Sequence, residues 1–361
     1  MIETANKDER PSSAGAGLIQ TLNPNYFALV MATGIVSIGC NLLELPRLAR
    51  ALFWLNIPAY LILLVFTVAR LMNYRSRFLA DLTDHKRGVG FFTTVAATCV
   101  LGNQFLLIAD LRSPAVGLWF LGTVLGFVLT YTIFTSFAVK ESKPPLPDGI
   151  HGGWLVSVVA VQSISVLGTM LSEGFGSSRE QILFFTLALW LAGGMLYMWI
   201  ISLIFYRYAF FPLSPADLAP PYWINMGAMA ISTLAGTALI SAASGSQLLS
   251  QLTPFLKGFT QFFRATATWW IPMLVILGVW RHIYKRFRLV YDPQYWGAVF
   301  PLGMYTVCTY RLSQAIDAPF LATIPRYFIY VAIAAWGLTF LSMLRSFVSM
   351  HGLNLTKRPS S

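Results

Sequence analysis

Residues 296–310, WGAVFPLGMYTVCTY, decide the fold, because this uncharged stretch is long enough with its flanks to cross a bilayer yet contains a central proline. Pro301 removes one backbone donor and its ring clashes with the preceding turn, so we expect a bend in this helix. Lipid tolerates such a bend mainly where neighbouring helices or water satisfy the freed backbone groups. The stretch is therefore expected to face protein or a pore, with the bulky ring of Phe300 at the bend.

The rest of the chain has the composition of a membrane protein. Of its 361 residues, 56% are hydrophobic and 11% are charged, and the mean hydropathy is +0.64. Apolar runs of about 20 residues recur along the chain, each long enough to span a bilayer. We therefore predict an all-α polytopic membrane protein. The net charge of +11 lies mostly in short loops, which is typical of the positive-inside rule and does not indicate a nucleic-acid partner.

Ten transmembrane helices are predicted, in one domain over residues 21–348. The tail at residues 1–20 is polar and expected to be disordered. Both this tail and the one at residues 349–361 are expected to be cytoplasmic. About 17 of the 25 Lys and Arg residues lie in these tails or in the loops after even-numbered spans, which favours this orientation in the cell inner (plasma) membrane. The predicted spans are Pro24–Leu43, Leu48–Met72, Gly88–Ile108, Ala115–Val139, Gly152–Leu171, Gln181–Tyr206, Pro221–Ile240, a span that begins between Pro254 and Ala265 and ends at Trp280, Pro293–Tyr310 and Ile324–Leu344.

The odd-numbered spans resemble one another. Each begins with an aromatic residue and continues with small and polar residues, whereas the even-numbered spans are rich in Leu, Phe and Ile. Two spans per repeat return the chain to the same side, so the five odd helices run parallel around an axis along the membrane normal. This predicts five helical hairpins in a quasi-five-fold array whose odd helices line a central pore. The alternative is that the odd spans are not repeats and resemble one another only because all transmembrane helices use similar residues. The aromatic anchors are Phe27, Phe92, Trp154, Trp223 and Trp296.

The odd spans carry no ionisable side chain in their middles, which disfavours a proton-coupled carrier and a cation channel with an acidic ring. The four histidines and three cysteines show no metal spacing, so we expect neither a metal nor another cofactor, and no enzyme. The small hydroxyl residues are candidates to line an anion pore, although packing between helices is the more common use of any single residue of this kind. These candidates are Thr33, Ser37, Thr93, Thr94, Thr98, Ser157, Ser163, Ser165, Ser232, Thr233 and Thr306.

Phe300 is the candidate pore gate, because its span is an inner one and its ring adjoins the bend at Pro301. Alignment of the odd spans on their aromatic anchors places mostly smaller residues opposite it, so its ring would occlude a central path. The alternative for any phenylalanine in a span is a place in the core or against lipid. Arg311 is a candidate for attracting anions at the outer mouth, or else an interfacial anchor. The residues assigned to the pore at the depth of the gate are Met31, Gly34, Ala96, Val158 and Gly227.

Two motifs, NPNYFALVMATGIVSIG at residues 23–39 and YWGAVFPLG at residues 295–303, resemble the tellurite-resistance and dicarboxylate transporter family. That family includes bacterial tellurite-resistance permeases, the fungal malate permease and sulfite efflux pump, and plant guard-cell slow anion channels. The resemblance covers residues 23–347. It implies a homotrimer with one pore in each protomer, and a phenylalanine of the ninth helix that plugs the pore, a role carried over to Phe300 alone.

The resemblance also implies passive, anion-selective transport of small inorganic or organic anions. The expected function is therefore an anion channel or passive uniporter, with membrane lipid as its surroundings. A proton-coupled exporter of C4-dicarboxylates such as malate, or of sulfite or tellurite, stays open as the alternative. The chain lacks the long cytoplasmic tails of the plant channels, so regulation by phosphorylation is not expected here.

Overall fold

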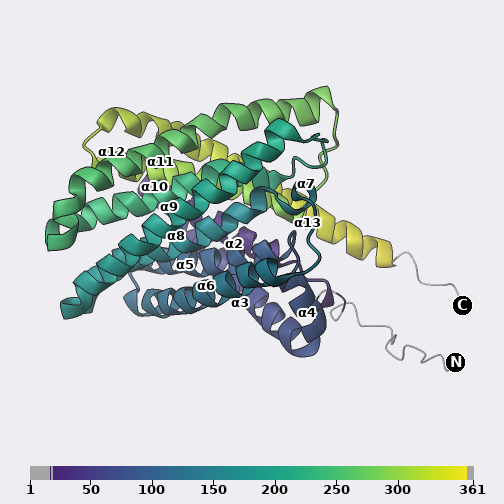
Figure 1. The fold of residues 1–361 in the computed structure, drawn as a ribbon, viewed down its shortest axis with the longest axis horizontal. Helices are drawn as coiled ribbons and strands as arrows, with labels where there is room; N and C mark the ends of the chain where they lie inside the picture. The colour runs from purple at the N-terminus through teal and green to yellow at the C-terminus, as the bar shows by residue number, and fades with distance from the viewer. Residues whose placement is uncertain (1–16, 18, 356–361) are drawn as a thin grey trace, which may run out of the picture.

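The computed structural model describes residues 17 and 19–355, with side-chain surroundings up to residue 348. Ten helices of 15 residues or more dominate the described residues, and no strand occurs among them (Figure 1). Most of the two predicted tails lies outside the described residues, although the last helix continues to Leu355 and so extends past the predicted span. The ten helices are α2 (Ala28–Leu42), α3 (Pro46–Asn73), α5 (Phe92–Leu107), α6 (Arg112–Val139), α8 (Val156–Leu171), α9 (Arg179–Phe210), α10 (Ile224–Ala242), α11 (Gln247–Val279), α12 (Trp296–Ala315) and α13 (Thr323–Leu355), with short helices α4 (Arg75–Leu82) and α7 (Leu146–Gly149) between them.

Eight helical segments of the described chain are long and apolar enough to cross a membrane, which identifies a polytopic membrane protein. One of these segments, Gly152–Phe210, contains both α8 and α9, which are separated by a 3-10 stretch in which Gly176 has a φ of 53°. The segment of α12 is not among the eight, and Pro301 lies within it. The predicted number of ten spans therefore stays a prediction.

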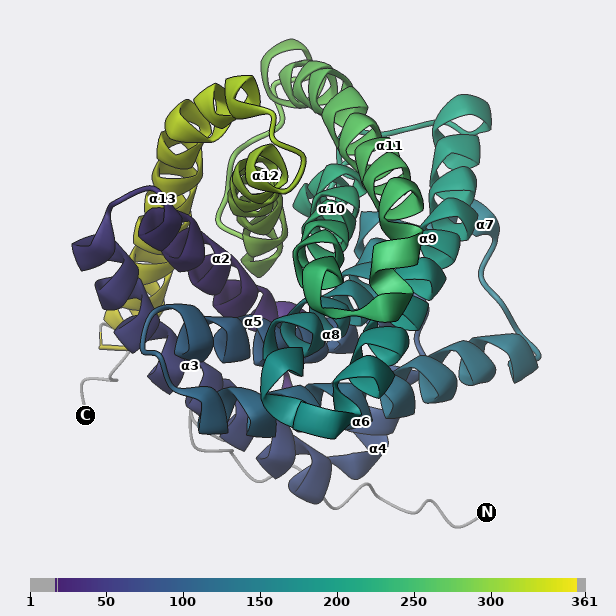
Figure 2. The same ribbon diagram turned by 90° about the vertical axis from the view of Figure 1, so that its left-hand side faces the viewer.

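The helices form five hairpins arranged in two concentric rings. Each odd helix of the prediction packs against the helix that follows it, in the pairs α2 with α3, α5 with α6, α8 with α9, α10 with α11 and α12 with α13. The inner helices contact one another in a closed circuit, from α2 through α5, α8, α10 and α12 back to α2. Figure 2 shows this inner ring nearly end on, with the partner helices outside it. The predicted five-hairpin array is confirmed.

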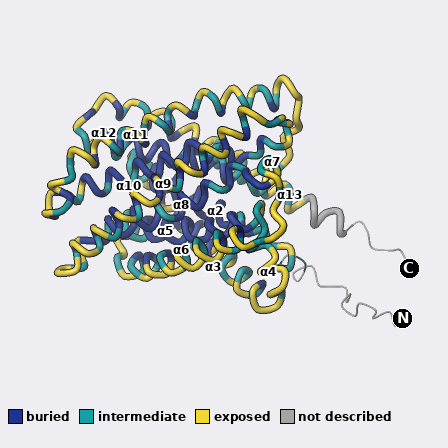
Figure 3. The backbone as a smooth tube through the Cα atoms, viewed as in Figure 1, coloured by how far each residue is buried: buried dark blue, intermediate teal, exposed yellow. Residues whose placement is uncertain are grey.

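Burial separates the two rings as the residue composition predicted (Figure 3). The most apolar windows of the segments that contain α2, α5 and α10 are 72%, 89% and 78% buried. The corresponding windows of the segments with α3, α6, α11 and α13 are only 22%, 22%, 22% and 17% buried. Small residues allow the inner helices to pack closely, whereas the Leu-rich and Phe-rich outer helices present apolar surface to lipid.

A second ring, which we call the collar, lies at the start of the inner helices. Each inner helix is preceded by a 3-10 turn, and the five turns contact one another in a closed circuit. Proline near the start of three turns fixes φ for a helical beginning. A Cβ on Gly152 would lie 2.5 Å from the carbonyl oxygen of Pro221, so glycine is required for this close approach. The turns are η1 (Pro24–Phe27), η2 (Gly88–Phe91), η3 (Gly152–Leu155), η5 (Pro220–Trp223) and η8 (Pro293–Tyr295).

His151 links the start of η3 to the loop before η2. Its Nδ1 accepts a hydrogen bond from the backbone N–H of Gly153 at 3.1 Å, and its Nε2 lies 3.2 Å from the carbonyl oxygen of Lys86. Burial lowers the pKa of His151 to about 4, so the ring is neutral at pH 7 and Nδ1 keeps the lone pair that the cap requires.

The largest difference from the predicted boundaries is at α11. This helix begins at Gln247, several residues before the predicted range of Pro254 to Ala265, because the Ser246 side chain accepts a hydrogen bond from the backbone N–H of Leu249 at 3.2 Å and caps it.

Candidate functional site: a narrow corridor inside the ring

A cavity of about 30 Å³ lies on the axis of the inner ring, because residues from all five inner helices line it. A space of this size holds about one water molecule. Most of the lining side chains are apolar, so the corridor is narrow and poorly hydrated at this depth. The lining residues are Ile35 and Ile38 from α2; Val100, Asn103 and Leu107 from α5; Ser163, Val166 and Met170 from α8; Ile231 and Leu234 from α10; and Met304, Val307 and Arg311 from α12.

A wider cavity of about 240 Å³, the outer vestibule, adjoins the first toward the C-terminal ends of the inner helices. The two cavities share Val166, Met170, Leu234 and Arg311 in their linings. Polar residues from α8, α10 and the 3-10 stretch after α8 also line the vestibule, namely Thr169, Ser172, Glu173, Thr237 and Ser241. A path therefore leads from this end of the ring to the central cavity.

Arg311 lies where the vestibule meets the central cavity and lines both. The ion pairs within the described chain join Arg70 and Arg87 to Asp81, and Arg207 to Asp217, so none of them neutralises Arg311. An unpaired guanidinium near a low-dielectric passage attracts anions more strongly than it would in water. The structure thus places the predicted cation at a mouth of the corridor.

The predicted gate layer lies one helical turn beyond the central cavity, toward the collar. Residues four positions apart lie on the same face of an α-helix, one turn from each other. Stepping back four residues from Met304, Ile35, Val100 and Ile231 of the cavity lining leads to Phe300, Met31, Ala96 and Gly227, respectively. On α8 the same step from Ser163 leads to Val159, next to the predicted Val158. Phe300, Ala96 and Val158 have 0% exposure and Met31 has 1%, so all four residues are fully buried.

Gly227 and Pro301 lie against each other at this layer. A Cβ on Gly227 would lie 2.7 Å from Cγ and 3.0 Å from Cβ of Pro301. The missing side chain of Gly227 therefore allows the part of α12 around Pro301 to pack directly on α10.

Gly227→Ala is expected to destabilise the protein by about 1–3 kcal/mol, because the added methyl group overpacks the contact with Pro301. Thermal unfolding in detergent measures this. Gly258→Ala on α11 is the control, since a Cβ there meets open space and alanine favours the helix by up to ~1 kcal/mol. Equal melting temperatures for the two variants would contradict the close packing of α10 on α12.

Gly34 has a different position from the other predicted pore residues. A Cβ on Gly34 would clash with Cγ1 of Val100 and lie 3.1 Å from Nδ2 of Asn56 and 3.2 Å from Oε1 of Gln104. Nδ2 of Asn56 donates hydrogen bonds to Oε1 of Gln104 at 2.7 Å and to the carbonyl oxygen of Val30 at 3.1 Å. Gly34 thus lies beside a buried amide network that joins α2, α3 and α5.

Most of the candidate hydroxyl residues do not line the central cavity; of the eleven, only Ser163 is among its lining residues. Several instead join an inner helix to an outer one, because a buried hydroxyl in an apolar interior needs a hydrogen-bond partner. Ser37 donates to the carbonyl oxygen of Ala49 at 2.7 Å, and Ser165 donates to that of Thr186 at 2.8 Å. These residues thus join helices to one another and do not line the central cavity. Thr98 with Tyr60 and Thr33 with Trp336 are further hydrogen-bonded pairs between an inner and an outer helix.

Asn103 is a lining residue that the sequence analysis missed. Its Nδ2 donates to the carbonyl oxygen of Cys99 at 3.1 Å, while its Oδ1 is buried without a partner in the described structure. The signal for it was an amide side chain inside an odd span. Only hydroxyl residues were predicted to line the pore. Within the described residues, no group of three or more His, Cys, Asp or Glu side chains is placed to hold a metal ion.

Comparison with known proteins adds to this geometry. The family described as SLAC1, voltage-dependent anion channel, matches residues 21–344 of the chain. The uncharacterized membrane protein Rv1735c of Mycobacterium tuberculosis is 39% identical over 157 residues, which are 44% of this chain and 79% of that protein. The uncharacterized transporter MJ0576 of Methanocaldococcus jannaschii is 27% identical over 304 residues, 82% of this chain and 85% of the transporter. The sulfite efflux pump SSU1 of Trichophyton rubrum is 22% identical over 342 residues, 89% of this chain and 90% of the pump.

Proposed function

We propose, from the premise that this chain belongs to the voltage-dependent anion channel family and is an anion transporter or channel, that it conducts anions passively through the inner ring and that Phe300 closes the resting pore. One observation carries the proposal. The central cavity is lined by all five inner helices and adjoins the vestibule at Arg311, and the fully buried Phe300 lies one helical turn before its lining residue Met304. Removal of this ring from the axis would join the outer vestibule to the collar.

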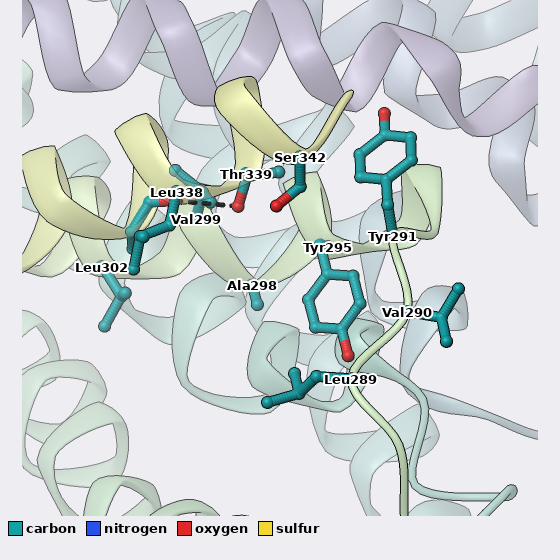
Figure 4. Close-up of a pocket in the computed structure, with 11 residues that line it drawn as sticks. Leu289, Val290, Tyr291, Tyr295, Ala298, Val299, Leu302, Leu338, Thr339 and Ser342 are labelled. Carbon is teal, nitrogen blue, oxygen red and sulfur yellow. Dashed lines mark hydrogen bonds between the residues drawn. The ribbon is translucent and has the colours of Figure 1, made fainter. Parts of the chain in front are cut away.

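The start of α12 has room to move, which supports a gate on this helix. A cavity of about 260 Å³ lies between part of it and α13, and Figure 4 shows Ala298 and Val299 of α12 with Leu338 and Thr339 of α13 among the lining residues. A second cavity of about 190 Å³ separates it from α11 on the other side, and Ala298 lines both. Pro301 removes a hydrogen bond directly after Phe300, so bending at this point is easy.

The electrostatics of the ring favour anions over cations. The corridor carries no acidic side chain in its central part, and Arg311 is the cationic residue of the central lining. The N-terminal ends of five parallel helices also converge at the collar, each stabilising a nearby anion by ~0.3–1 kcal/mol. Glu173 in the vestibule opposes the entry of anions, and Arg311, which lines both cavities, is the cation that offsets its charge next to the corridor.

Reversal potentials test the proposal. We expect purified protein in planar bilayers to give currents that reverse near the equilibrium potential of the anion, both for chloride and for nitrate gradients. A pH gradient alone is expected to drive no net current or flux. Reversal near the cation potential would contradict an anion channel.

A coupled exporter is the second candidate, because sulfite efflux pumps are among the relatives that cover most of the chain. In liposomes, sulfite, malate or tellurite uptake that requires a pH gradient would favour the exporter. Uptake driven by the anion gradient alone, with no effect of a protonophore, would favour the channel.

The proposal also includes a homotrimer in the inner membrane with both termini in the cytoplasm. Large apolar side chains remain exposed on the outer ring, where lipid or neighbouring protomers would cover them, and Trp54, Phe120, Trp199, Ile276 and Leu338 are examples. The mass of the protein in detergent tests the trimer, and labelling of a cysteine added at the C-terminus tests the orientation.

A further inference from the structure

A crevice of about 190 Å³ lies beside the collar, between the end of α11 and the start of α12, away from the central cavity. We call it the basic crevice, because Arg281 and His282 line it. Its other lining residues come from the segment before α10, from α11, from η8 and from α12: Leu218, Ala219, Pro220, Tyr222, Trp223, Leu274, Leu277, Gly278, Tyr295 and Ala298.

Arg281 is an unusual cation, because it is buried to 9% exposure and has no acidic partner among the described ion pairs. Its Nε is buried without a hydrogen-bond partner, and its guanidinium lies over the Phe287 ring at 4.5 Å from the centroid. The neighbouring carboxylate, Asp292, instead accepts a hydrogen bond from the backbone N–H of Gln294 at 2.8 Å. A buried charge is unfavourable unless a counter-charge pairs with it, so the crevice is chemically suited to an anion.

The surroundings of Arg281 favour an anion attached to an apolar chain. Leu274 and Leu277 form the apolar depth of the crevice, and the outer surface of the same helix end exposes Val279 and Ile283 to 48% and 70%. An acyl chain can therefore continue from the crevice along a lipid-facing surface. The exposed basic residues of the loop after α11 add positive charge on the same side, and these are Lys285, Arg286 and Arg288. Basic pockets between membrane helices, next to such a cluster, are typical sites for acidic phospholipid headgroups.

We propose that the basic crevice binds an anionic phospholipid, with its phosphate paired to Arg281 and an acyl chain against Leu274 and Leu277. The crevice also borders the gate helix, because Tyr295 and Ala298 line it and Ala298 lies two residues before Phe300. A bound lipid fills the space into which the start of α12 would move, so it favours the closed position of the helix. The binding is independent of the proposed function, whereas this effect on the gate rests on it.

Native mass spectrometry of the full-length protein tests the binding, with phosphatidylglycerol and phosphatidylcholine as probes. Arg281→Gln is expected to weaken phosphatidylglycerol binding about fivefold or more, the effect of one basic residue at an anionic headgroup. Arg75→Gln is the matched control, because Arg75 is exposed on α4 and does not line the crevice, and a change of less than twofold is expected. Equal weakening by both variants, or equal binding of phosphatidylcholine, would overturn the proposal.

Gly278→Phe provides a second variant in case Arg281→Gln does not fold. Gly278 lines the crevice and a Cβ there meets open space, so a phenylalanine would occupy the lipid position without a clash at its Cβ. Gly258→Phe, on the same helix with equal freedom, is its control. We expect Gly278→Phe alone to reduce phosphatidylglycerol binding. Competition by millimolar inorganic phosphate would instead assign the crevice to a free anion and overturn the lipid as occupant.

The effect on the gate is measured separately, as the conductance of bilayers with increasing phosphatidylglycerol. Wild-type conductance is expected to fall as this lipid increases, and that of Arg281→Gln to stay constant. If lipid binding depends on Arg281 but conductance is absent in every lipid, the channel function fails while the lipid site stands. A conductance equally sensitive to the lipid in both proteins would overturn the effect on the gate.

Discussion

Phe300→Ala is expected to raise anion conductance about tenfold or more, because loss of the ring lowers the barrier at the gate layer and ~1.4 kcal/mol corresponds to a factor of ten. Phe300 is fully buried one turn from the central cavity, and its counterparts at this depth include Ala96 and Gly227. These small residues cannot replace the lost volume. Single-channel and macroscopic currents in planar bilayers measure the change.

The control for this prediction is Phe53→Ala. Phe53 is 2% exposed on the outer helix α3 and packs edge-on against Phe105 at a centroid distance of 5.2 Å. Its loss creates a cavity that costs about 3–5 kcal/mol of stability, as the loss of a buried phenylalanine does. We expect Phe53→Ala to leave the conductance low. Similar currents for the two variants would mean that loosened packing, and not an unblocked axis, produces the conductance.

Arg311→Glu is expected to have the second largest effect, lowering anion conductance about tenfold at low salt. Arg311 lines both the outer vestibule and the central cavity, where Glu173 is the neighbouring acid, so the substitution makes this mouth entirely negative. The deficit should shrink as ionic strength rises, because salt screens exposed charges over about 10 Å at 0.1 M. Conductance of the Phe300→Ala background at several salt concentrations measures both effects.

Arg326→Glu is the matched control for Arg311→Glu. Arg326 is exposed on the outer helix α13 and lines neither cavity. We expect its replacement to change the conductance less than twofold. A salt-independent loss in Arg311→Glu would indicate a structural role for the arginine instead of an electrostatic one.

The sequence predicted the hairpin array because the repeat depends on periodic features. An aromatic residue begins each odd span, and the small residues that follow must be buried against other helices. The ring contacts of α2, α5, α8, α10 and α12 and the burial of α2, α5 and α10 confirm this reasoning. Helix ends were less accessible to prediction. The start of α11 depends on the Ser246 cap, and Pro254 inside the helix gave a false signal for a boundary.

The side-chain directions within the ring could not be predicted from residue type. Ser37 and Ser165 are small and polar, as pore-lining residues are, yet both donate to backbone carbonyl oxygens of outer helices. A hydroxyl can form its hydrogen bond whether it faces the pore or an outer helix, so only the rotation of its own helix decides which way it faces. The basic crevice was also hidden, because the burial of Arg281 depends on how α11 meets the start of α12.

Moving the phenylalanine side chain from α12 to another inner helix tests the gate layer most directly. Ala96 on α5 has 0% exposure and belongs to the same layer as Phe300, so a phenylalanine there restores the lost volume from the facing side. We predict that the currents opened by Phe300→Ala return nearly to the wild-type level in Phe300→Ala/Ala96→Phe, but not in Phe300→Ala/Gly117→Phe, where Gly117 on α6 meets open space. If the Phe300→Ala/Ala96→Phe protein is folded and conducts as well as Phe300→Ala, anions do not pass along the axis of the ring and the account is contradicted.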